Sequence, residues 1–279
     1  IKWDIEVPSY KVLGNEALKS QISGAFLPKH FPGFNKYLWI DADAWVNSWE
    51  AIDLYIKGSD NNKLAVSTSA DRSSGRVLRA DWFFRNYAKI KSQNYKHAKS
   101  SGFSETIART IGLMPHLNLG VFCLNQHAPH WEVWQKNLKK ALKHGKIYGS
   151  GQVAMNIAIY YNNLPAEFLP TYCNWIYMDN IKFDLKKNTF VEPYLPNHKI
   201  GIIHLAGKNN DHMRSNKSFL SEVKTLDGKI IKKNLVSSNK TIGPTFIHIK
   251  IQKGSIENLG RPTIHPKDVA KRFKNFLES

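Results

Sequence analysis

Cysteine is scarce in this sequence, with Cys123 and Cys173 as the two examples among 279 residues. Both lie among apolar residues, so we expect reduced thiols in the core and no disulfide framework, which favours a cytoplasmic location, with peripheral contact at a membrane left open. No apolar run approaches the ~18 residues that a membrane-spanning helix needs, and no signal peptide, repeat or low-complexity tract is visible. The chain opens at Ile1 within an apparently structured stretch, so we expect a fragment or a processed form.

Acidic residues are scarce as well, because 22 Asp and Glu stand against 40 Lys and Arg, for a formal net charge of +18. Residues 206–279 contain 15 basic and 6 acidic residues and so carry +9 of that total. A field of this sign attracts nucleotide phosphates, acidic glycans, anionic lipids or nucleic acid, although a solvated basic surface without a partner has the same composition. The sequence lacks an aromatic RNA-binding signature, a helix-turn-helix pattern and zinc-ligand spacing, so we expect no nucleic-acid partner.

Apolar residues make up 42% of the chain, which is enough for a large core, and one apolar run leads directly into two carboxylates. Residues 37–40 (Tyr-Leu-Trp-Ile) predict a buried strand, and Asp41 and Asp43 follow it at once. On an extended chain, residues two apart face the same side, so both carboxylates would face one cation. A divalent cation would relieve the repulsion between them. The alternative is a solvated turn, or a cap for the following helix.

Strand and helix patterns alternate along residues 15–208. The expected strands are 37–40, 64–68, 119–124 and 199–204, and the expected helices are 15–28, 48–58, 79–91, 131–144 and one that opens at 149–152, with polar loops at 69–75 and 92–104. This alternation predicts an open α/β sheet with ligands at the carboxyl ends of its strands. Further on, a hairpin turn at Asp227-Gly228, a β-rich run at 245–251 and a helix from about Pro266 predict a small basic α+β extension. We therefore expect a catalytic domain at 1–208 and an extension at 209–279.

Five short motifs resemble, in the same order, those of the metal-dependent glycosyltransferases of family 8. They are the acidic strand at 37–46, Asn118-Leu119-Gly120-Val121, Gly151-Gln152 followed by Asn156, Leu169-Pro170 followed by Asn174-Trp175, and Ile202-Ile203-His204-Leu205-Ala206-Gly207-Lys208. The resemblance covers about residues 15–208. It implies a GT-A-like open mixed sheet flanked by helices. It also implies retaining transfer of a sugar from a nucleotide-sugar, most simply a UDP-sugar, to a glycan, lipid or protein acceptor.

The resemblance also implies roles for single residues. Asp41, Asp43 and His204 would hold Mn²⁺ or Mg²⁺, which acts as a Lewis acid on the departing diphosphate, and Asp41 would also contact the donor's ribose. Gly207 and Lys208 would belong to the donor site, with Lys208 on a phosphate oxygen. Asn118 and Gln152 would hydrogen-bond hydroxyls of the transferred sugar.

The chain departs from the family pattern at Gly151, where the family has an acid, and after Lys208, where no Pro-Trp follows. Two other readings compete with a transferase. A phosphatase of the haloacid dehalogenase type also places Asp-x-Asp at a strand end, but position 45 is Trp and no downstream acidic pair is evident. A basic module that binds nucleic acid or a membrane surface would carry the two aspartates incidentally.

Overall fold

The computed structural model describes residues 20–69, 78–83, 87–144, 148–178, 180–207, 210–216 and 218–236. Within these ranges it describes the backbone but not the side chains of residues 20–21, 78–83 and 87–91. The chain divides into two compact units, Ile1–Thr245 and Phe246–Ser279, and the second lies wholly outside the described residues. Several predictions also fall outside them: the helix start at Asn15, the loop at 69–75 beyond Ser69, the donor-site residue Lys208, the β-rich run at 245–251 and the helix from Pro266.

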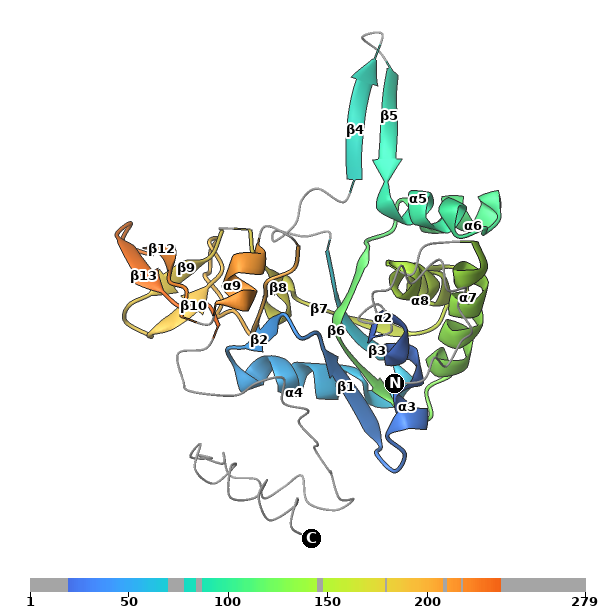
Figure 1. Cartoon of the computed structure of the whole chain (residues 1–279), viewed down its shortest axis with the longest axis horizontal. Coiled ribbons are helices and arrows are strands. Elements are labelled where there is room, and N and C mark those ends of the chain that lie inside the picture. Colours follow the sequence, from blue (N-terminus) through green and yellow to red (C-terminus); the bar gives the residue numbers. More distant parts are fainter. Residues whose placement is uncertain are drawn as a thin grey trace. The chain divides into compact units, whose positions relative to one another are not determined.

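A four-stranded mixed sheet forms the centre of the first unit (Figure 1). Its strand order is β1 (Lys36–Ile40), β6 (Leu117–Asn125), β3 (Leu64–Thr68) and β7 (Ala166–Leu169). The β1–β6 and β6–β3 pairs are antiparallel, and β3–β7 is parallel. This arrangement confirms an α/β fold with an open mixed sheet.

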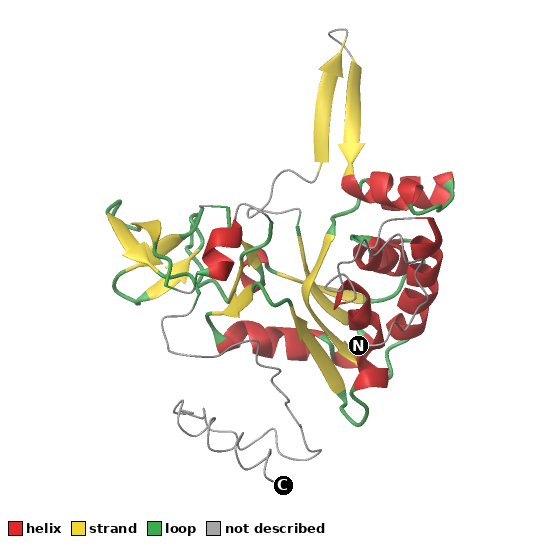
Figure 2. Ribbon diagram, viewed as in Figure 1, coloured by secondary structure: helices red, strands yellow, loops and turns green. Residues whose placement is uncertain are grey.

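Helices cover both faces of this sheet (Figure 2). Alternate strand residues face opposite sides: Leu64, Val66 and Phe122 pack with α7 (His130–His144) and α8 (Ser150–Tyr160), whereas Ala65 and Cys123 pack with α4 (Trp49–Gly58). The remaining helical segments are α2 (Ser20–Ser23), η2 (Gly24–Phe26), α3 (Leu27–His30), η3 (Asp60–Asn62), α5 (Gln93–Ser100), α6 (Glu105–Gly112), η4 (Thr171–Cys173) and α9 (Asp211–Ser215). The period of two along the strands therefore builds a core on each face.

Three smaller sheets complete the described part. One has the order β2 (Ala44–Val46), β11 (Ile202–His204), β8 (Trp175–Ile176); another has the order β10 (Thr189–Val191), β9 (Lys182–Asp184), β12 (Ser221–Thr225), β13 (Ile230–Lys233); the third is the hairpin of β4 (Leu78–Phe83) and β5 (Tyr87–Ser92). The β9–β12 pair joins strands from either side of position 208. A separate core that includes Trp175, Phe183 and Ile203 supports the first two of these sheets.

Several sequence predictions are confirmed by these elements. The expected strands at 64–68 and 119–124 lie in β3 and β6, and the helices at 48–58, 131–144 and from 150 correspond to α4, α7 and α8. The Asp227-Gly228 turn joins β12 to β13, with Gly228 at a φ of +87°. Cys123 and Cys173 are buried free thiols. None of the described helices has the length and apolar character required to cross a membrane.

The helix predicted at 79–91 is wrong, because this segment forms the β4–β5 hairpin. Residues 88–91 (Ala-Lys-Ile-Lys) alternate apolar and basic residues, a period of two that indicates a strand.

The loop predicted at 92–104 is also wrong, because α5 occupies 93–100. Polar contacts stabilise this helix: Ser92 Oγ accepts the Tyr95 amide at 3.1 Å, and Asn94 Nδ2 donates to the carbonyls of Ile111 and Met114. Pro28 does not end a helix but lies in the first turn of α3, where its missing N–H is tolerated.

Two buried histidines make the stability of this fold depend on pH. Burial lowers the pKa of His116 and of His130 from 6.5 to about 4. Between pH 6.5 and 4 the unfolded chain binds protons that the native state excludes, so acidification through this window should lower the free energy of unfolding. The loss should reach up to about 3 kcal/mol per histidine, and it should be absent above pH 7. Urea unfolding at pH 7 and pH 4.5 measures it. The variant His130→Gln should lose less stability between pH 7 and pH 4.5 than the wild type does, whereas His127→Gln, at an exposed position, should behave as the wild type. Equal losses of stability in the two variants would contradict the role of His130.

Candidate metal centre

The two aspartates lie in a tight turn between two sheets. β1 ends at Ile40, β2 begins at Ala44, and the Ala44 amide donates to the Asp41 carbonyl at 3.0 Å. The expected extended geometry is therefore wrong, and the turn brings the two carboxylates together instead. β1 is also half-buried and not buried as expected, because it is an edge strand of its sheet.

Strand pairing places the histidine beside this turn. β11 runs antiparallel to β2 with His204 opposite Ala44, and the Leu205 amide donates to the Asp43 carbonyl at 2.8 Å. The backbone register thus holds the end of β11 against a turn that lies about 160 residues earlier in the chain.

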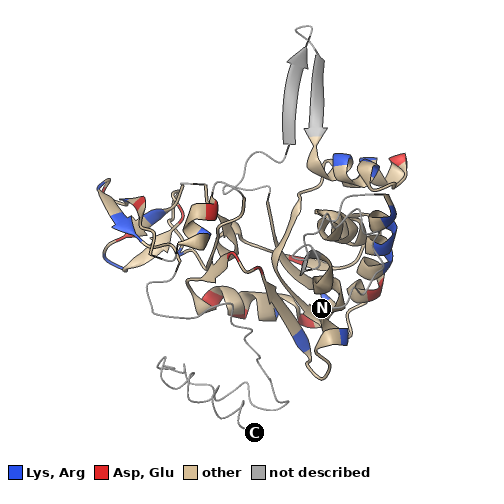
Figure 3. Ribbon diagram, in the orientation of Figure 1, with Lys and Arg blue, Asp and Glu red and all other residues tan. Residues whose placement is uncertain are grey.

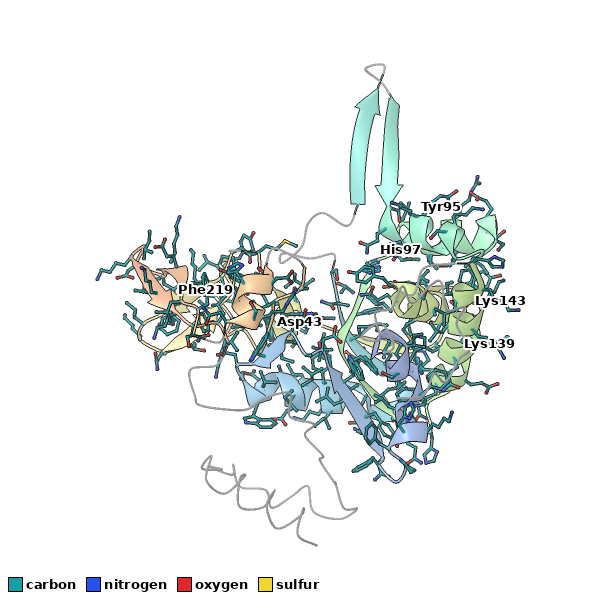
Figure 4. All side chains as sticks on the ribbon, in the orientation of Figure 1. Asp43, Tyr95, His97, Lys139, Lys143 and Phe219 are labelled. Atoms are coloured by element: carbon teal, nitrogen blue, oxygen red, sulfur yellow. The ribbon has the colours of Figure 1, made fainter. Side chains whose placement is uncertain are left out.

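The side chains of Asp41, Asp43 and His204 converge. His204 Nε2 lies 3.2 Å from Asp43 Oδ1 and 4.0 Å from Asp41 Oδ2, and one donor atom from each residue lies within 4.8 Å of the other two. The His204 side chain is 5% exposed, whereas those of Asp41 and Asp43 are 41% and 28% exposed, so the cluster is closed on the histidine side and open on the carboxylate side. Figure 4 shows Asp43 at the junction between the two sheets.

Each of the three side chains is oriented by a separate neighbour. Trp39 Nε1 donates to Asp41 Oδ1 at 2.7 Å, and Arg214 Nη1 donates to Asp43 Oδ2 at 3.3 Å. His204 Nδ1 lies 3.0 Å from Asn174 Oδ1, so with Nδ1 protonated the lone pair is on Nε2, the nitrogen that faces the carboxylates. In each side chain, one polar atom contacts the orienting neighbour and the other polar atom faces the cluster. This arrangement is expected of metal ligands that are held in place by surrounding residues.

Arg214 also organises the loop that follows His204. Its guanidinium donates to the carbonyls of Leu205 and Gly207 and pairs with Asp211. Because Nη1 of the same guanidinium also donates to Asp43, the arginine ties the loop to the candidate metal centre. We interpret it as a positioning residue.

The two carboxylates differ in their electrostatics. Burial raises the pKa of Asp41, and the Trp39 hydrogen bond and the His204 charge only partly offset it. Burial also acts against ionisation of Asp43, but when Nε2 of His204 is protonated and no cation is bound, the hydrogen bond and charge of His204, with the charge of Arg214, outweigh burial and lower the pKa of Asp43. A cation placed between the two would favour the ionised form of both.

Gly120 provides the space for this cluster. A Cβ at this position would lie 2.2 Å from His204 Cε1, closer than two carbon atoms can approach without a bond, and 3.0 Å from Asp41 Oδ2, a tight contact. The Gly120 carbonyl also accepts the Asp41 amide at 2.7 Å. The glycine inside β6 therefore leaves room for the His204 imidazole beside the strand.

The other predicted residues are placed as follows. Asn118 is buried on β6, its Oδ1 accepts the Gly120 amide at 3.2 Å, and its Nδ2 has no hydrogen-bond partner in the described structure. Gln152 lies half-buried in the first turn of α8. Gly207 has a φ of +90° and open space at its Cα. Lys208 lies outside the described residues.

Sequence reasoning missed two of the orienting partners. Trp39 precedes Asp41 by two positions on one strand, so the strand period could have paired them. Arg214 and Asp43 are 171 residues apart, and no local pattern connects them. Asn174 was singled out only as part of a resembling motif.

The donor set suits a hard divalent cation. Two carboxylate oxygens and one imidazole nitrogen fit Mn²⁺ or Mg²⁺ with water or a ligand's oxygens in the remaining positions. Two neighbouring ligand atoms in an octahedral site of such an ion subtend a right angle at the ion and lie about 3 Å from each other. The distance between His204 Nε2 and Asp43 Oδ1, 3.2 Å, is close to this value. These three residues could hold the ion with little rearrangement.

Comparisons with known proteins give little further information. No family model matches the sequence, and no solved structure matches it. A 43-residue segment is 44% identical to a phosphonopyruvate decarboxylase of Streptomyces viridochromogenes, and covers 15% of this chain and 11% of that protein. A 42-residue segment is 48% identical to the Streptomyces hygroscopicus protein of the same name, and covers 15% and 10%. The chain thus matches about a tenth of the length of these curated proteins.

Proposed function

We propose that the chain is a metal-dependent glycosyltransferase, of hexosyltransferase type and GT-A-like fold, that moves a sugar from a UDP-sugar to a glycan, lipid or protein acceptor. The observation that carries this proposal is the convergence of Asp41, Asp43 and His204, each held by a partner of its own. The ordered resemblance to glycosyltransferase family 8 supplies the reaction class. It also implies retention of configuration.

In this proposal the three residues hold Mn²⁺ or Mg²⁺, which as a Lewis acid would neutralise the charge that develops on the leaving diphosphate. Trp39, Arg214 and Asn174 keep the ligands in position before the donor binds, so little reorganisation is required when it arrives. The open carboxylate side of the cluster is where the diphosphate would enter.

The remaining roles follow the resemblance. Asp41 would also contact the ribose, and Lys208, with Gly207 before it, would contact a phosphate. Asn118 and Gln152 would hydrogen-bond the transferred sugar; the partnerless buried Nδ2 of Asn118 supports a donor role, since such groups are rarely left unsatisfied. The basic extension at 209–279 would contact an anionic acceptor or a membrane face.

Thermal stabilisation by UDP with Mn²⁺ tests this function. At a ligand concentration of about 100 times Kd the native state should gain roughly 2.7 kcal/mol, which corresponds to a Tm increase of about 5 °C or more. Mn²⁺ alone should produce a smaller shift, and a screen of nucleotide-sugars for Mn²⁺-dependent hydrolysis should identify the donor. Absence of a shift with every nucleotide, beside tight and salt-sensitive binding to DNA, would support the basic binding module instead.

A further inference from the structure

A groove of about 590 Å³ lies between α6, α7 and α8, on elements other than those that carry the metal centre. Its apolar lining comes from Phe103, Ile107 and Ile157, and half-exposed Tyr161 lies at its edge. Phe103 and Ile157 belong to a core cluster that α6 and α8 share, so the apolar lining is part of a packed interior.

Four lysines of α7 line the same groove. Lys136, Lys139, Lys140 and Lys143 follow one another at spacings of three, one and three residues, which places them on one side of the helix. Figure 3 shows this basic stretch along α7, and Figure 4 shows Lys139 and Lys143 projecting from it. All four are exposed.

The positive charge of the groove is not balanced. Among the described residues none of the four lysines forms an ion pair, and no carboxylate is among the residues that line the groove. Lys140 Nζ lies 5.1 Å from the centre of the Phe103 ring, a cation–π contact that holds one ammonium above the apolar lining. Like charges at these spacings repel, so an anion in the groove would be stabilised.

Two side-chain amides add neutral polar groups. Asn137 Nδ2 donates to Asn162 Oδ1 at 3.2 Å and to the Ala154 carbonyl at 3.3 Å. Asn137 Oδ1 and Asn162 Nδ2, an acceptor and a donor, have no hydrogen-bond partner among the described residues, and both residues line the groove. An adjacent acceptor and donor are suited to the hydroxyl groups of a sugar.

We propose that this groove binds a segment of an acidic oligosaccharide. Its carboxylates would pair with the lysines, the apolar C–H faces of its rings would pack on exposed Tyr161 and half-buried Ile107, and its hydroxyls would bond to the Asn137–Asn162 amide pair. A bilayer fits less well, because membrane-surface binding requires apolar side chains that protrude, whereas Phe103 and Ile157 are recessed. In the proposed transferase the groove would hold the acceptor chain. This role rests on the proposed function, whereas the binding of an acidic oligosaccharide to the groove does not depend on it.

Calorimetry with an oligogalacturonate tests the proposal on the full chain. The matched variants remove four positive charges each: Lys136→Gln, Lys139→Gln, Lys140→Gln and Lys143→Gln in the groove, and exposed Lys57→Gln, Lys186→Gln, Lys187→Gln and Lys199→Gln, which lie outside both the groove and the 209–279 extension, as the control. We expect at least about a 10-fold loss of affinity for the groove variant, less than about a 3-fold loss for the control, and weak binding of a neutral malto-oligosaccharide of equal length. Asn162→Ala, which keeps every charge, should weaken oligogalacturonate binding as well.

Two results would overturn this inference. Equal losses in both quadruple variants would show that binding follows net charge alone. Groove-dependent binding to vesicles of phosphatidylcholine and phosphatidylglycerol, without binding of the oligogalacturonate, would identify a lipid surface. Both quadruple variants should keep the stabilisation by UDP and Mn²⁺; a wild-type chain that lacks this stabilisation but binds the oligogalacturonate would reject the transferase and leave the groove site intact.

Discussion

Gly120→Ala is expected to abolish Mn²⁺ binding. The added Cβ would lie 2.2 Å from His204 Cε1, and this imidazole is 5% exposed and held by Asn174 and by the β2–β11 pairing. The ring must therefore move away from the carboxylates, and separation of one ligand from the other two destroys the site. We expect about a 100-fold or greater loss of Mn²⁺ affinity by calorimetry, with some loss of stability from overpacking, on the order of 1–3 kcal/mol.

Gly24→Ala is the matched control. Gly24 is also buried, but a Cβ there would lie 3.5 Å from its nearest neighbour, Trp134, which is an ordinary contact. This variant should bind Mn²⁺ as the wild type does. A Gly120→Ala protein with unchanged Mn²⁺ affinity would show that His204 is not a ligand.

Asp43→Asn should lower the affinity for Mn²⁺ by about 100-fold or more, because replacement of residues that only support ligands already costs 10–100-fold. The direction of the effect follows from Arg214, which donates to the outer oxygen of this side chain. An asparagine would turn its carbonyl oxygen toward the guanidinium and its NH₂ toward His204, so a group that cannot bind a cation would face the site. The Asp43→Asn variant should also lose the Tm increase that UDP and Mn²⁺ produce in the wild type.

The control for this substitution is Asp53→Asn, which removes the same charge from the exposed surface of α4. It should leave Mn²⁺ affinity within about 2-fold of the wild type, since an exposed charge outside the cluster is screened by salt. If Asp43→Asn binds Mn²⁺ as tightly as Asp53→Asn does, the metal centre is elsewhere.

The sequence showed the residue types of the candidate metal centre but not its geometry. Asp41 and Asp43 were predicted to face one cation because of strand periodicity, and they do converge, but through a turn. Their position after an apolar run was readable because it depends on neighbours in the chain. The conformation of residues 41–44 could not be predicted from neighbours in the chain, because it is set by the pairing of β2 with β11, which lies far away in the sequence.

Supporting contacts were the least predictable part of the site. Asn174 and His204 are 30 residues apart, and Arg214 and Asp43 are 171 apart, so these pairs exist only after the sheets have assembled. The β4–β5 hairpin was misread for a different reason. Its sequence fits a weak helical pattern as well as a strand pattern, and tertiary context decides between them. Strongly periodic elements such as α7 were predicted correctly because the apolar stripe alone defines the buried face.

Asp41 follows a strand of the four-stranded sheet, whereas His204 ends a strand of a second sheet, and the two sheets share a core that includes Val121 and Ile202. An ion shared by Asp41 and His204 would cross-link two sheets that also meet through this core and through the turn at 41–44. Loss of the ion would then loosen their mutual docking, and any loosening of the docking would weaken the hold on the ion, since the two equilibria are linked. Metal content would therefore help to determine how firmly the two sheets are held together.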